Sequence, residues 1–503
     1  MSFALYLSCG IKKYDMQKLS SFFLVVGLVM ILFSCTKDTS SGGVGNESEN
    51  ESQVEEDGSN STLAEKVFLG YNGRSTEGPS WTDERFLSLI SASGTMCIRY
   101  PGGTQANSWD WKEGKLVDKA DPKYLFRIKD LVAGLPETAQ VVYVMNMVNT
   151  PERVGVEQAL TNQSIEALHL KIDDALFALK EFDRLGRLPM AVELGNEFYF
   201  QNEHAAFYGQ NPQLYIEHVK VICEEIHDVY PDMKIAVVTT KGGTKIRDAW
   251  NKVVYDALSN DDFLKKHVYA VVQHHYISNT TGNTALRITD GNTAEQALAE
   301  AFAYMESVKE DYENVPEGYK LWITEFGVTK YSKLEEEGMW PIGLSYAVMV
   351  LSWLEMGNKI DCYMLHHITN NPAVINTFSM CMGPAAIVYK EIIALMTECK
   401  SVSHSESYAD GKVRQWVFSH EGSKKVLLIN TSASVIKGFD ISGEIKADSY
   451  RVTQYFAPNI IQSPVSEDNG IEKKSLVSES VIDIEPFGFC VIEECLVNQK
   501  SNL

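Results

Sequence analysis

The chain has 503 residues and a formal net charge of −22. Hydrophobic residues make up 45% of it and aromatic residues 10%, so the chain can form a packed core and is neither disordered nor collagen-like. The excess of acidic residues argues against a protein that binds nucleic acid along a basic face. It also disfavours a strongly anionic polymer as a substrate, unless a local basic cleft overrides the net charge.

The first 35 residues have the pattern of an export signal. Three lysines between residues 12 and 18 precede an apolar run over residues 22–33, which is too short to span a bilayer. The sequence Leu-Phe-Ser-Cys at residues 32–35 resembles the lipobox of bacterial lipoproteins, in which the cysteine is lipidated. We therefore expect residues 1–35 to be a lipoprotein signal peptide with Cys35 as the lipidation site. The alternative is an ordinary signal peptide with an incidental cysteine.

Lipidation at Cys35 predicts a protein of the bacterial cell envelope, anchored in the outer membrane and facing either the periplasm or the cell exterior. Residues 36–61 are rich in Gly, Ser, Asn and acidic residues and contain no aromatic residue. Such a segment cannot bury a core, so we expect a flexible tether. The membrane is then contacted only through the lipid anchor.

The cysteines do not predict a disulfide framework or a zinc site. Of the nine cysteines, seven remain if Cys9 and Cys35 are set aside, and no pair has Cys-x-x-Cys spacing. We expect no metal and no cofactor.

Between residues 67 and 399, short apolar runs rich in β-branched residues alternate with longer amphipathic segments. Helices are predicted over residues 165–185, 212–229 and 294–312, and Gly94 and Gly357 are predicted to end two others. Eight strands are predicted, over residues 67–71, 96–100, 140–145, 190–194, 234–239, 268–273, 321–324 and 360–365.

Eight strand–helix units favour an α/β fold that closes into a (β/α)8 TIM barrel, here over residues 62–399. An open doubly wound sheet is the alternative, but no Gly-x-Gly-x-x-Gly follows the first strand. The pattern then changes to shorter runs with turn signals. This pattern of short strands and turns predicts an antiparallel β-sandwich domain over residues 400–496 and a tail over residues 497–503.

Two glutamates follow predicted barrel strands. Glu197 ends the sequence Glu-Leu-Gly-Asn-Glu after the fourth strand, and Glu325 follows the seventh strand in Thr-Glu-Phe-Gly. In a closed barrel the C-terminal ends of the strands meet at one rim, so these carboxylates should lie together although 128 residues separate them (325 − 197). Cleavage of a glycosidic bond needs a proton for the leaving oxygen and either a nucleophile or an activated water, and two carboxyl groups can supply both.

Asn-Glu after strand four with Glu after strand seven resembles clan A of the glycoside hydrolases over residues 67–399. The resemblance implies that Glu197 is the general acid/base, that Glu325 is the nucleophile, and that the anomeric configuration is retained. It also implies that Asn196 hydrogen-bonds the sugar 2-hydroxyl. The alternative for Asn196 is a turn residue at the end of the strand. We expect the carboxylate of Glu325 to keep Glu197 protonated.

Arg99 ends the second predicted strand in Arg-Tyr-Pro-Gly-Gly, where a cation would keep the nucleophile ionised. This run with Trp109 and Trp111 downstream resembles arabinofuranosidase-type family 51 and, more loosely, heparanase-like family 79. Clan A members commonly carry an Arg here. An Arg that only bridges loops is the structural alternative.

The sixth predicted strand ends in His274-His275-Tyr276, and the His-x-Tyr arrangement resembles clan A, in which the Tyr hydroxyl reaches the nucleophile. Neighbours on a strand point to opposite faces, so the two histidines should not bind one metal ion and one of them should face the pocket. Asn146, Tyr199 and Lys241 are further candidates for sugar contacts, each also compatible with a solvated or packing role. Trp109, Trp111 and Trp340 could stack on sugar rings or belong to the core.

These observations predict a retaining glycoside hydrolase that acts on a polysaccharide or oligosaccharide by double displacement. The context of Glu325 differs from the Trp-containing one usual in family 51, so families 30, 39, 51 and 79 remain open, as do an arabinofuranosidase, an enzyme acting beside uronic acids and another endo-enzyme. A catalytically inactive surface glycan-binding lipoprotein and a transglycosylase are the alternatives. The oligomeric state is not predicted.

Overall fold

The computed structural model of the protein describes most of the chain from residue 60 to residue 495. Within that range it leaves out residues 64–65, 74, 118, 149–164, 201–205, 279, 282–283, 286–287, 330–338, 369–372, 378, 446, 448, 461–469 and 479. The predicted signal peptide with Cys35, nearly all of the predicted tether and the predicted tail lie outside the described residues. Within them, no helix is both long and apolar enough to cross a membrane.

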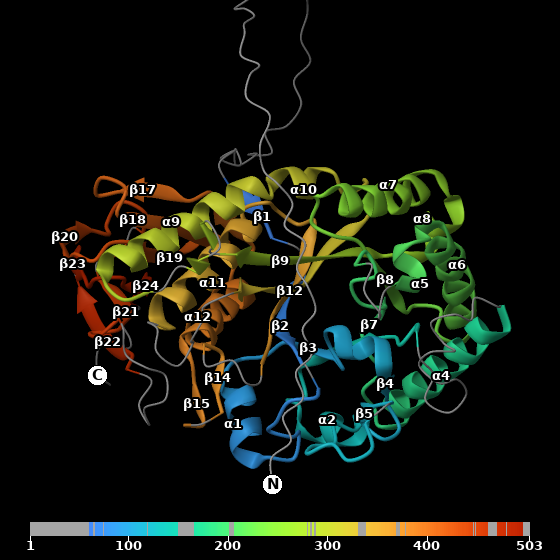
Figure 1. Cartoon of the computed structure of the whole chain (residues 1–503). Coiled ribbons are helices and arrows are strands. Elements are labelled where there is room, and N and C mark those ends of the chain that lie inside the picture. The colour runs from blue at the N-terminus through green and yellow to red at the C-terminus, as the bar shows by residue number, and fades with distance from the viewer. Residues whose placement is uncertain are drawn as a thin grey trace, which may run out of the picture. The chain divides into compact units, whose positions relative to one another are not determined.

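Eight parallel strands close into a barrel, because the last of them, β13, pairs with the first, β2. Figure 1 labels several of these strands, among them β2, β3, β9 and β12. In barrel order they are β2 (Phe68–Asn72), β3 (Cys97–Tyr100), β6 (Gln140–Val144), β7 (Ala191–Leu194), β8 (Lys234–Val238), β9 (Ala270–Ser278), β12 (Lys320–Thr329) and β13 (Ile360–Leu365). The predicted TIM barrel and all eight of its strands are therefore confirmed.

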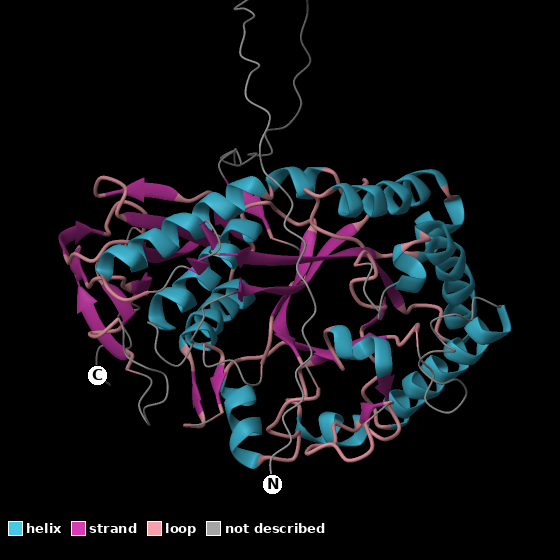
Figure 2. Ribbon diagram, in the orientation of Figure 1, coloured by secondary structure: helices cyan, strands magenta, loops and turns pink. Residues whose placement is uncertain are grey.

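Helices surround the barrel strands (Figure 2). The longer ones are α1 (Glu84–Ala92), α2 (Ile128–Gly134), α4 (Ile165–Arg184), α6 (Pro212–Val229), α7 (Lys245–Asn260), α9 (Gly291–Ser307), α11 (Met339–Leu354) and α12 (Pro384–Glu398). Their starts follow local chemistry, since the side chains of Asp83, Thr244 and Asp290 cap the first turns of α1, α7 and α9. Gly94 and Gly357 follow α1 and α11 with φ of 70° and 85°, which confirms the predicted helix stops.

The sixth and seventh barrel strands are longer than predicted. Pairing between β9 and β12 continues to Ser278 and Thr329, beyond the predicted ends at residues 273 and 324. The apolar pattern stops earlier because the rim side chains are polar, but the backbone hydrogen bonds of two adjacent strands do not depend on side-chain polarity. His274, Tyr276 and Glu325 therefore lie within strands and not in the loops after them.

The C-terminal part contains a large antiparallel sheet and a smaller two-stranded one. The large sheet has the order β1-β16-β18-β19-β24-β21-β22, with β17 paired to β18, and β20 and β23 form a smaller pair. The strands are β1 (Asn60–Thr62), β16 (Ser401–Ser403), β17 (Glu406–Tyr408), β18 (Val413–His420), β19 (Ser423–Asn430), β20 (Ile436–Asp440), β21 (Tyr450–Phe456), β22 (Glu472–Ser478), β23 (Val481–Ile484) and β24 (Phe489–Glu494).

Alternation along β19 shows how this sheet is buried on both faces. Leu427 and Ile429 belong to the core that includes the barrel helices, whereas Val426 and Leu428 belong to a second core with Ile482 and Ile484 of β23. The sheet thus packs against the barrel on one face and carries its own small core on the other. Its edge includes β1, which lies in sequence before the barrel.

Candidate active site

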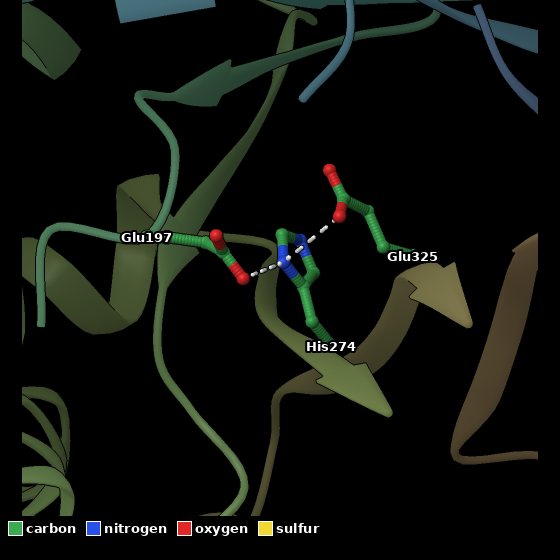
Figure 3. Close-up of side chains that lie close together, drawn as sticks. All are labelled: Glu197, His274 and Glu325. Atoms are coloured by element: carbon green, nitrogen blue, oxygen red, sulfur yellow. Dashed lines mark hydrogen bonds and ion pairs between the residues drawn. The ribbon is translucent and has the colours of Figure 1, made fainter. Parts of the chain in front are cut away.

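The rim of the barrel brings together side chains from four strands. Arg99 lies on β3, Glu197 follows β7, His274 and Tyr276 lie on β9, and Glu325 lies on β12. Figure 3 shows Glu197 and Glu325 pointing toward each other with the His274 imidazole between them. The closure of the barrel therefore joins the two carboxylates that the sequence separates.

A β-bulge aims Glu325 at this rim. Ile323 of β12 pairs with Gln273 of β9, but the next pair is Glu325 with His274, so Thr324 is an extra residue. Strict alternation from Trp322, which belongs to the barrel interior, would turn Glu325 toward the surrounding helices. The extra residue restores the inward direction, and a bulge beside a reactive group is a recurrent device.

A strained turn aims Glu197. Its φ is 50°, a left-handed value that non-glycine residues adopt rarely and that concentrates at functional sites. Gly195, just before it, has φ 87°, and a Cβ at that position would meet the Phe198 ring at 2.0 Å. The sequence Gly-Asn-Glu thus folds locally into a turn that only this glycine permits.

The two carboxylates are close. One oxygen of Glu197 and one of Glu325 lie within 4.8 Å of each other and of a His274 ring nitrogen. His274 Nδ1 lies 2.9 Å from Glu197 Oε1 and 3.5 Å from Glu325 Oε2. Burial lowers the pKa of His274, but Glu325 and Glu197 outweigh it and raise that pKa above its ordinary value.

Glu325 is held as an anion. Its Oε1 accepts hydrogen bonds from Arg99 Nη1 at 2.6 Å and from Asn72 Nδ2 at 2.8 Å, and its Oε2 accepts one from the Tyr276 hydroxyl at 2.5 Å. Burial alone would raise the pKa of this carboxyl, but the charges of His274, His366 and Arg99 with the Tyr276 hydrogen bond hold it well below its usual range. An ionised carboxylate is the form that can act as a nucleophile.

Glu197 differs from Glu325 in its surroundings. Its side chain is 19% exposed, against 5% for that of Glu325, and its Oε1 accepts a hydrogen bond from the Tyr199 hydroxyl at 2.9 Å. No guanidinium or ammonium group of the described residues forms an ion pair with it. The more open carboxyl, without a permanent cation beside it, suits proton transfer with an incoming group.

Arg99 connects several groups of the site by hydrogen bonds. Besides Glu325, it donates to both oxygens of Glu193, at 2.8 and 2.6 Å, and to Asn196 Oδ1 at 2.8 Å. Burial would lower the pKa of Arg99, but Glu193 and Glu325 raise it, so the guanidinium stays charged. One side chain thus fixes the turn that carries Glu197 and the oxygen of Glu325.

Glu193 and Asn72 were not predicted from the sequence. Asn72 is the last residue of β2, and Glu193 interrupts the apolar run of β7 just before Leu194. A polar residue near the end of an apolar strand is the signal that could have found them, but their partners become visible only when the strands are adjacent. His366, which follows β13, lies with Nδ1 2.8 Å from Asn72 Nδ2 and 3.6 Å from Glu325 Oε2. These residues complete the surroundings of Glu325.

Asn196 offers an unused donor. Its Nδ2 is buried and has no hydrogen-bond partner among the described residues, while its Oδ1 is held by Arg99. Its backbone is fixed by Asn107, whose side chain bonds both the Asn196 amide and its carbonyl. A fixed, unsatisfied amide donor beside Glu197 fits the predicted bond to a sugar hydroxyl.

His274 and His275 point to opposite faces of β9, as the strand period predicts. His275 packs against Trp353 with ring centroids 5.5 Å apart, behind the barrel wall. Burial lowers its pKa to about 3, so it stays neutral. Only His274 belongs to the site.

A cavity of about 640 Å³ opens over the carboxylates. Its lining includes Gly103, Thr104, Gln105, Glu197, Tyr199, Phe200, Lys241, Gly242, Gly243, Arg247, His274, Tyr276, Tyr304, Glu325 and His366. Its size suits a sugar ring with a neighbour. Polar groups with a few aromatic faces are the usual lining of a carbohydrate site.

Three predicted contacts lie elsewhere. Trp109 is buried, with Nε1 donating to the Tyr100 hydroxyl at 3.0 Å, and Trp111 Nε1 donates to Asp174 at 3.0 Å. Asn146 donates to the Trp109 carbonyl and accepts from the Val148 amide. None of the three is among the residues that line this cavity, and the hydrogen bonds above tie them to neighbouring loops and helices. Their contact with a sugar stays a prediction.

The ligand atoms of Glu197, His274 and Glu325 are close enough together to hold a metal ion. However, both oxygens of Glu325 already accept hydrogen bonds, and the Arg99 guanidinium lies 2.6 Å from one of them. A divalent cation would have to displace these donors and approach a fixed positive charge. The arrangement therefore favours proton chemistry over metal binding.

Comparisons with known proteins bear on the fold. No family model and no curated protein sequence matches the chain. Among solved structures, the family 51 alpha-L-arabinofuranosidase of Bifidobacterium longum is similar with a TM-score of 0.60 and 13% identity, over 87% of this chain and 98% of that one. The 4-O-alpha-L-rhamnosyl-beta-D-glucuronidase of Fusarium oxysporum, in a Rha-GlcA complex, gives 0.58 and 13% over the same shares.

An alpha-L-arabinofuranosidase of Thermotoga maritima, in an arabinose complex, is similar with a TM-score of 0.57 and 15% identity, over 87% of this chain and 98% of that one. The chain thus shares its fold with the retaining glycoside hydrolases of clan A, and the predicted resemblance is confirmed at the level of the fold. At these identities the likeness does not extend to an activity.

Proposed function

We propose that the protein is a retaining glycoside hydrolase with Glu325 as the nucleophile and Glu197 as the general acid/base. The observation that carries the proposal is the unequal pair of carboxylates, with oxygens within 4.8 Å of each other and with Glu325 alone held by a guanidinium. Retaining enzymes have their carboxyl groups about 5–5.5 Å apart, whereas inverting enzymes need room for a water molecule between them.

In the first step a Glu325 oxygen attacks the anomeric carbon, and Glu197 gives its proton to the leaving glycosidic oxygen. The Glu197 carboxylate then takes a proton from water, whose oxygen attacks the same carbon and releases Glu325. Asn72, Arg99 and Tyr276 orient the nucleophile, and the free Nδ2 of Asn196 binds the sugar 2-hydroxyl as positive charge develops. No external cofactor enters these steps.

The substrate is proposed only as a class, a polysaccharide or oligosaccharide. The solved neighbours include arabinose and Rha-GlcA complexes, which supports a carbohydrate partner for this site as well. A lipid anchor at Cys35 would hold the enzyme at the cell envelope, where such polymers are met. An arabinofuranosidase, an enzyme acting beside uronic acids and another endo-enzyme remain the candidate activities.

The test is hydrolysis of plant, algal and animal polysaccharides and aryl glycosides by the wild type, followed by NMR of the first anomer released. We expect retention of configuration and loss of turnover in Glu325→Gln, with Glu317→Gln, an exposed glutamate before β12, as the matched control. Glu197→Gln should lower kcat/KM by about 10²–10⁴ for poor leaving groups. An inverted product would contradict the assignment of Glu325.

Three other outcomes identify the alternatives. Binding of a glycan without any cleavage would indicate the glycan-binding lipoprotein, and products longer than the substrate would indicate a transglycosylase. Activity that is lost with EDTA and regained with a divalent cation would indicate that Glu197, His274 and Glu325 bind a metal ion. We expect EDTA to have no effect.

A further inference from the structure

Two cations, Lys241 and Arg247, line the cavity. Lys241 follows β8, and Arg247 lies in the first turn of α7. Within the described part of the chain neither forms an ion pair, although the sequence has 67 acidic and 45 basic residues. In so acidic a chain, unpaired cations at the substrate cavity need a physical explanation.

Aromatic rings hold both cations in place. Lys241 Nζ lies 4.2 Å from the centre of the Tyr304 ring, and the Arg247 guanidinium lies 5.4 Å from Tyr199 and 5.3 Å from Phe200. A ring face attracts a cation without neutralising it, so both charges remain available to a ligand. The rings also restrict two side chains that would otherwise move freely in solvent.

The neighbouring carboxylates already accept hydrogen bonds from backbone amides. Asp311 accepts a hydrogen bond from the Gly242 amide, and Asp248 accepts one from the Gly243 amide, each at 2.9 Å. Burial lowers the pKa of Lys241, Asp311 opposes this, and the charge of Arg247 adds to it. The two cations thus repel each other, and a bound anion would relieve this repulsion.

The subsite lies beside the proton donor. Tyr199, whose ring carries Arg247, donates its hydroxyl to Glu197. If Glu197 is the proton donor of the proposed function, on which this inference rests, groups beside it face the sugar that leaves. Arg247 is therefore on the leaving-group side of the cleavage point, and Lys241 lines the same cavity.

We propose that Lys241 and Arg247 form an anion-binding subsite, and that the glycan cleaved here carries a carboxylate or a sulfate ester on the leaving-group side. Both groups are planar or tetrahedral oxyanions that an ammonium and a guanidinium bind by charge-assisted hydrogen bonds. A local basic cleft then overrides the net charge of the chain for this substrate.

The experiment compares size-defined acidic oligosaccharides with neutral counterparts of the same backbone. Uronate-containing probes are paired with their carboxyl-reduced forms, and sulfated probes with their desulfated forms, so the two pairs distinguish the sources of the anion. Hydrolysis is measured with the wild type, and affinity with Glu325→Gln. We expect kcat/KM on the preferred acidic probe to fall about 10- to 100-fold for each of Lys241→Met and Arg247→Met, and affinity to weaken with added salt.

Lys245→Met is the control variant, because Lys245 is exposed on the same helix and does not line the cavity. It removes the same charge and should change kcat/KM by less than about twofold. Arg247→Lys and Lys241→Arg keep the charge and should retain much of the activity that the methionine variants lose. Melting temperatures of all variants show whether a loss comes from the fold.

The outcomes separate this inference from the proposed function. Cleavage of neutral glycans only, with Lys241→Met and Arg247→Met no different from Lys245→Met, overturns the subsite and leaves the hydrolase intact. Binding of acidic probes that depends on both cations, without cleavage by the wild type, overturns the hydrolase and supports the subsite. Neither cleavage nor cation-dependent binding of any probe overturns both.

Discussion

The buried pair of Glu193 and Arg99 sets the positions of both candidate catalytic carboxylates. Both side chains have no exposed surface, and the guanidinium contacts Glu325 and Asn196 as well. A buried charge that loses its partner is costly, so we expect Glu193→Gln to lower the free energy of unfolding by about 3–5 kcal/mol. Because Arg99 then loses its anchor, kcat should fall more than KM rises.

Glu181 provides the matched control for this prediction. It accepts the same two-pronged hydrogen bonds from Arg184, at 2.8 Å each, but on the protein surface. Exposed pairs are screened by water, so Glu181→Gln should leave stability and activity nearly unchanged. Chemical denaturation and steady-state kinetics check both variants. Equal losses of stability in the two would refute the role of burial.

The two neighbouring histidines of β9 should show opposite pH dependence. The pKa of His274 is raised by the carboxylates, so its contribution to stability is present below its unfolded value near 6.5 and is lost as the pH rises through the folded value. The difference in unfolding free energy between wild type and His274→Gln should therefore shrink between about pH 6 and about pH 9.

His275 has its pKa lowered to about 3 by burial, so its unfolded form takes up a proton first as the pH falls. The difference between wild type and His275→Gln should grow, by under about 1 kcal/mol, over the same rise in pH. Urea unfolding at the two pH values measures both differences. Parallel behaviour of the two variants would contradict the assignment of His274 to the charged site.

Among single residues, the sequence predicts best those whose role follows from strand position and motif. Glu197, Glu325, Arg99 and Tyr276 each end or continue a recognisable strand pattern, and the structure brings them together. Glu193 is harder, because a buried glutamate becomes intelligible only through an arginine that lies 94 residues away in sequence.

At the scale of elements, strand existence could be predicted, but strand ends and the bulge could not. The apolar run stops at Ile323, whereas pairing continues to Thr329. Ile323 and Phe326 both face the outer core, which a strict period of two does not allow without an inserted residue. Such an insertion depends on the register against β9, and register is a property of two strands.

The loop from β8 to α7 shows that the prediction of function from sequence is limited in the same way. Lys241 lies in a loop, where its place after a strand predicts only a sugar contact, and Arg247 lies at a helix start, where the sequence gives no signal of a site. Their common feature is a set of ring faces from Tyr199, Phe200 and Tyr304, which belong to other segments. A specificity subsite of this kind becomes visible only in three dimensions.

At the scale of the whole described molecule, the barrel and the C-terminal sheet share one core. Leu427 and Ile429 of β19 lie in the same cluster as residues of the helices α11 and α12. In addition, β1, which precedes the barrel in sequence, pairs with β16 of the sheet. Two parts that share a core lose it together, so we expect a single cooperative unfolding transition for both. The continuous apolar run of β19 over residues 426–429 predicts two buried faces but does not say which partner covers each.

Trp340 tests this coupling. It lies at the start of α11, is 2% exposed, and donates Nε1 to the Phe487 carbonyl of the C-terminal sheet region at 2.8 Å. Trp340→Ala should lower the free energy of unfolding by about 3–5 kcal/mol, because it leaves a cavity and an unpaired carbonyl between the two parts. Trp340→Phe keeps most of the volume and should lose much less. Since both parts depend on the same contact, far-UV circular dichroism and tryptophan fluorescence should report one common midpoint in wild type and both variants. Two separated transitions in the wild type would show that the barrel and the sheet are stable independently.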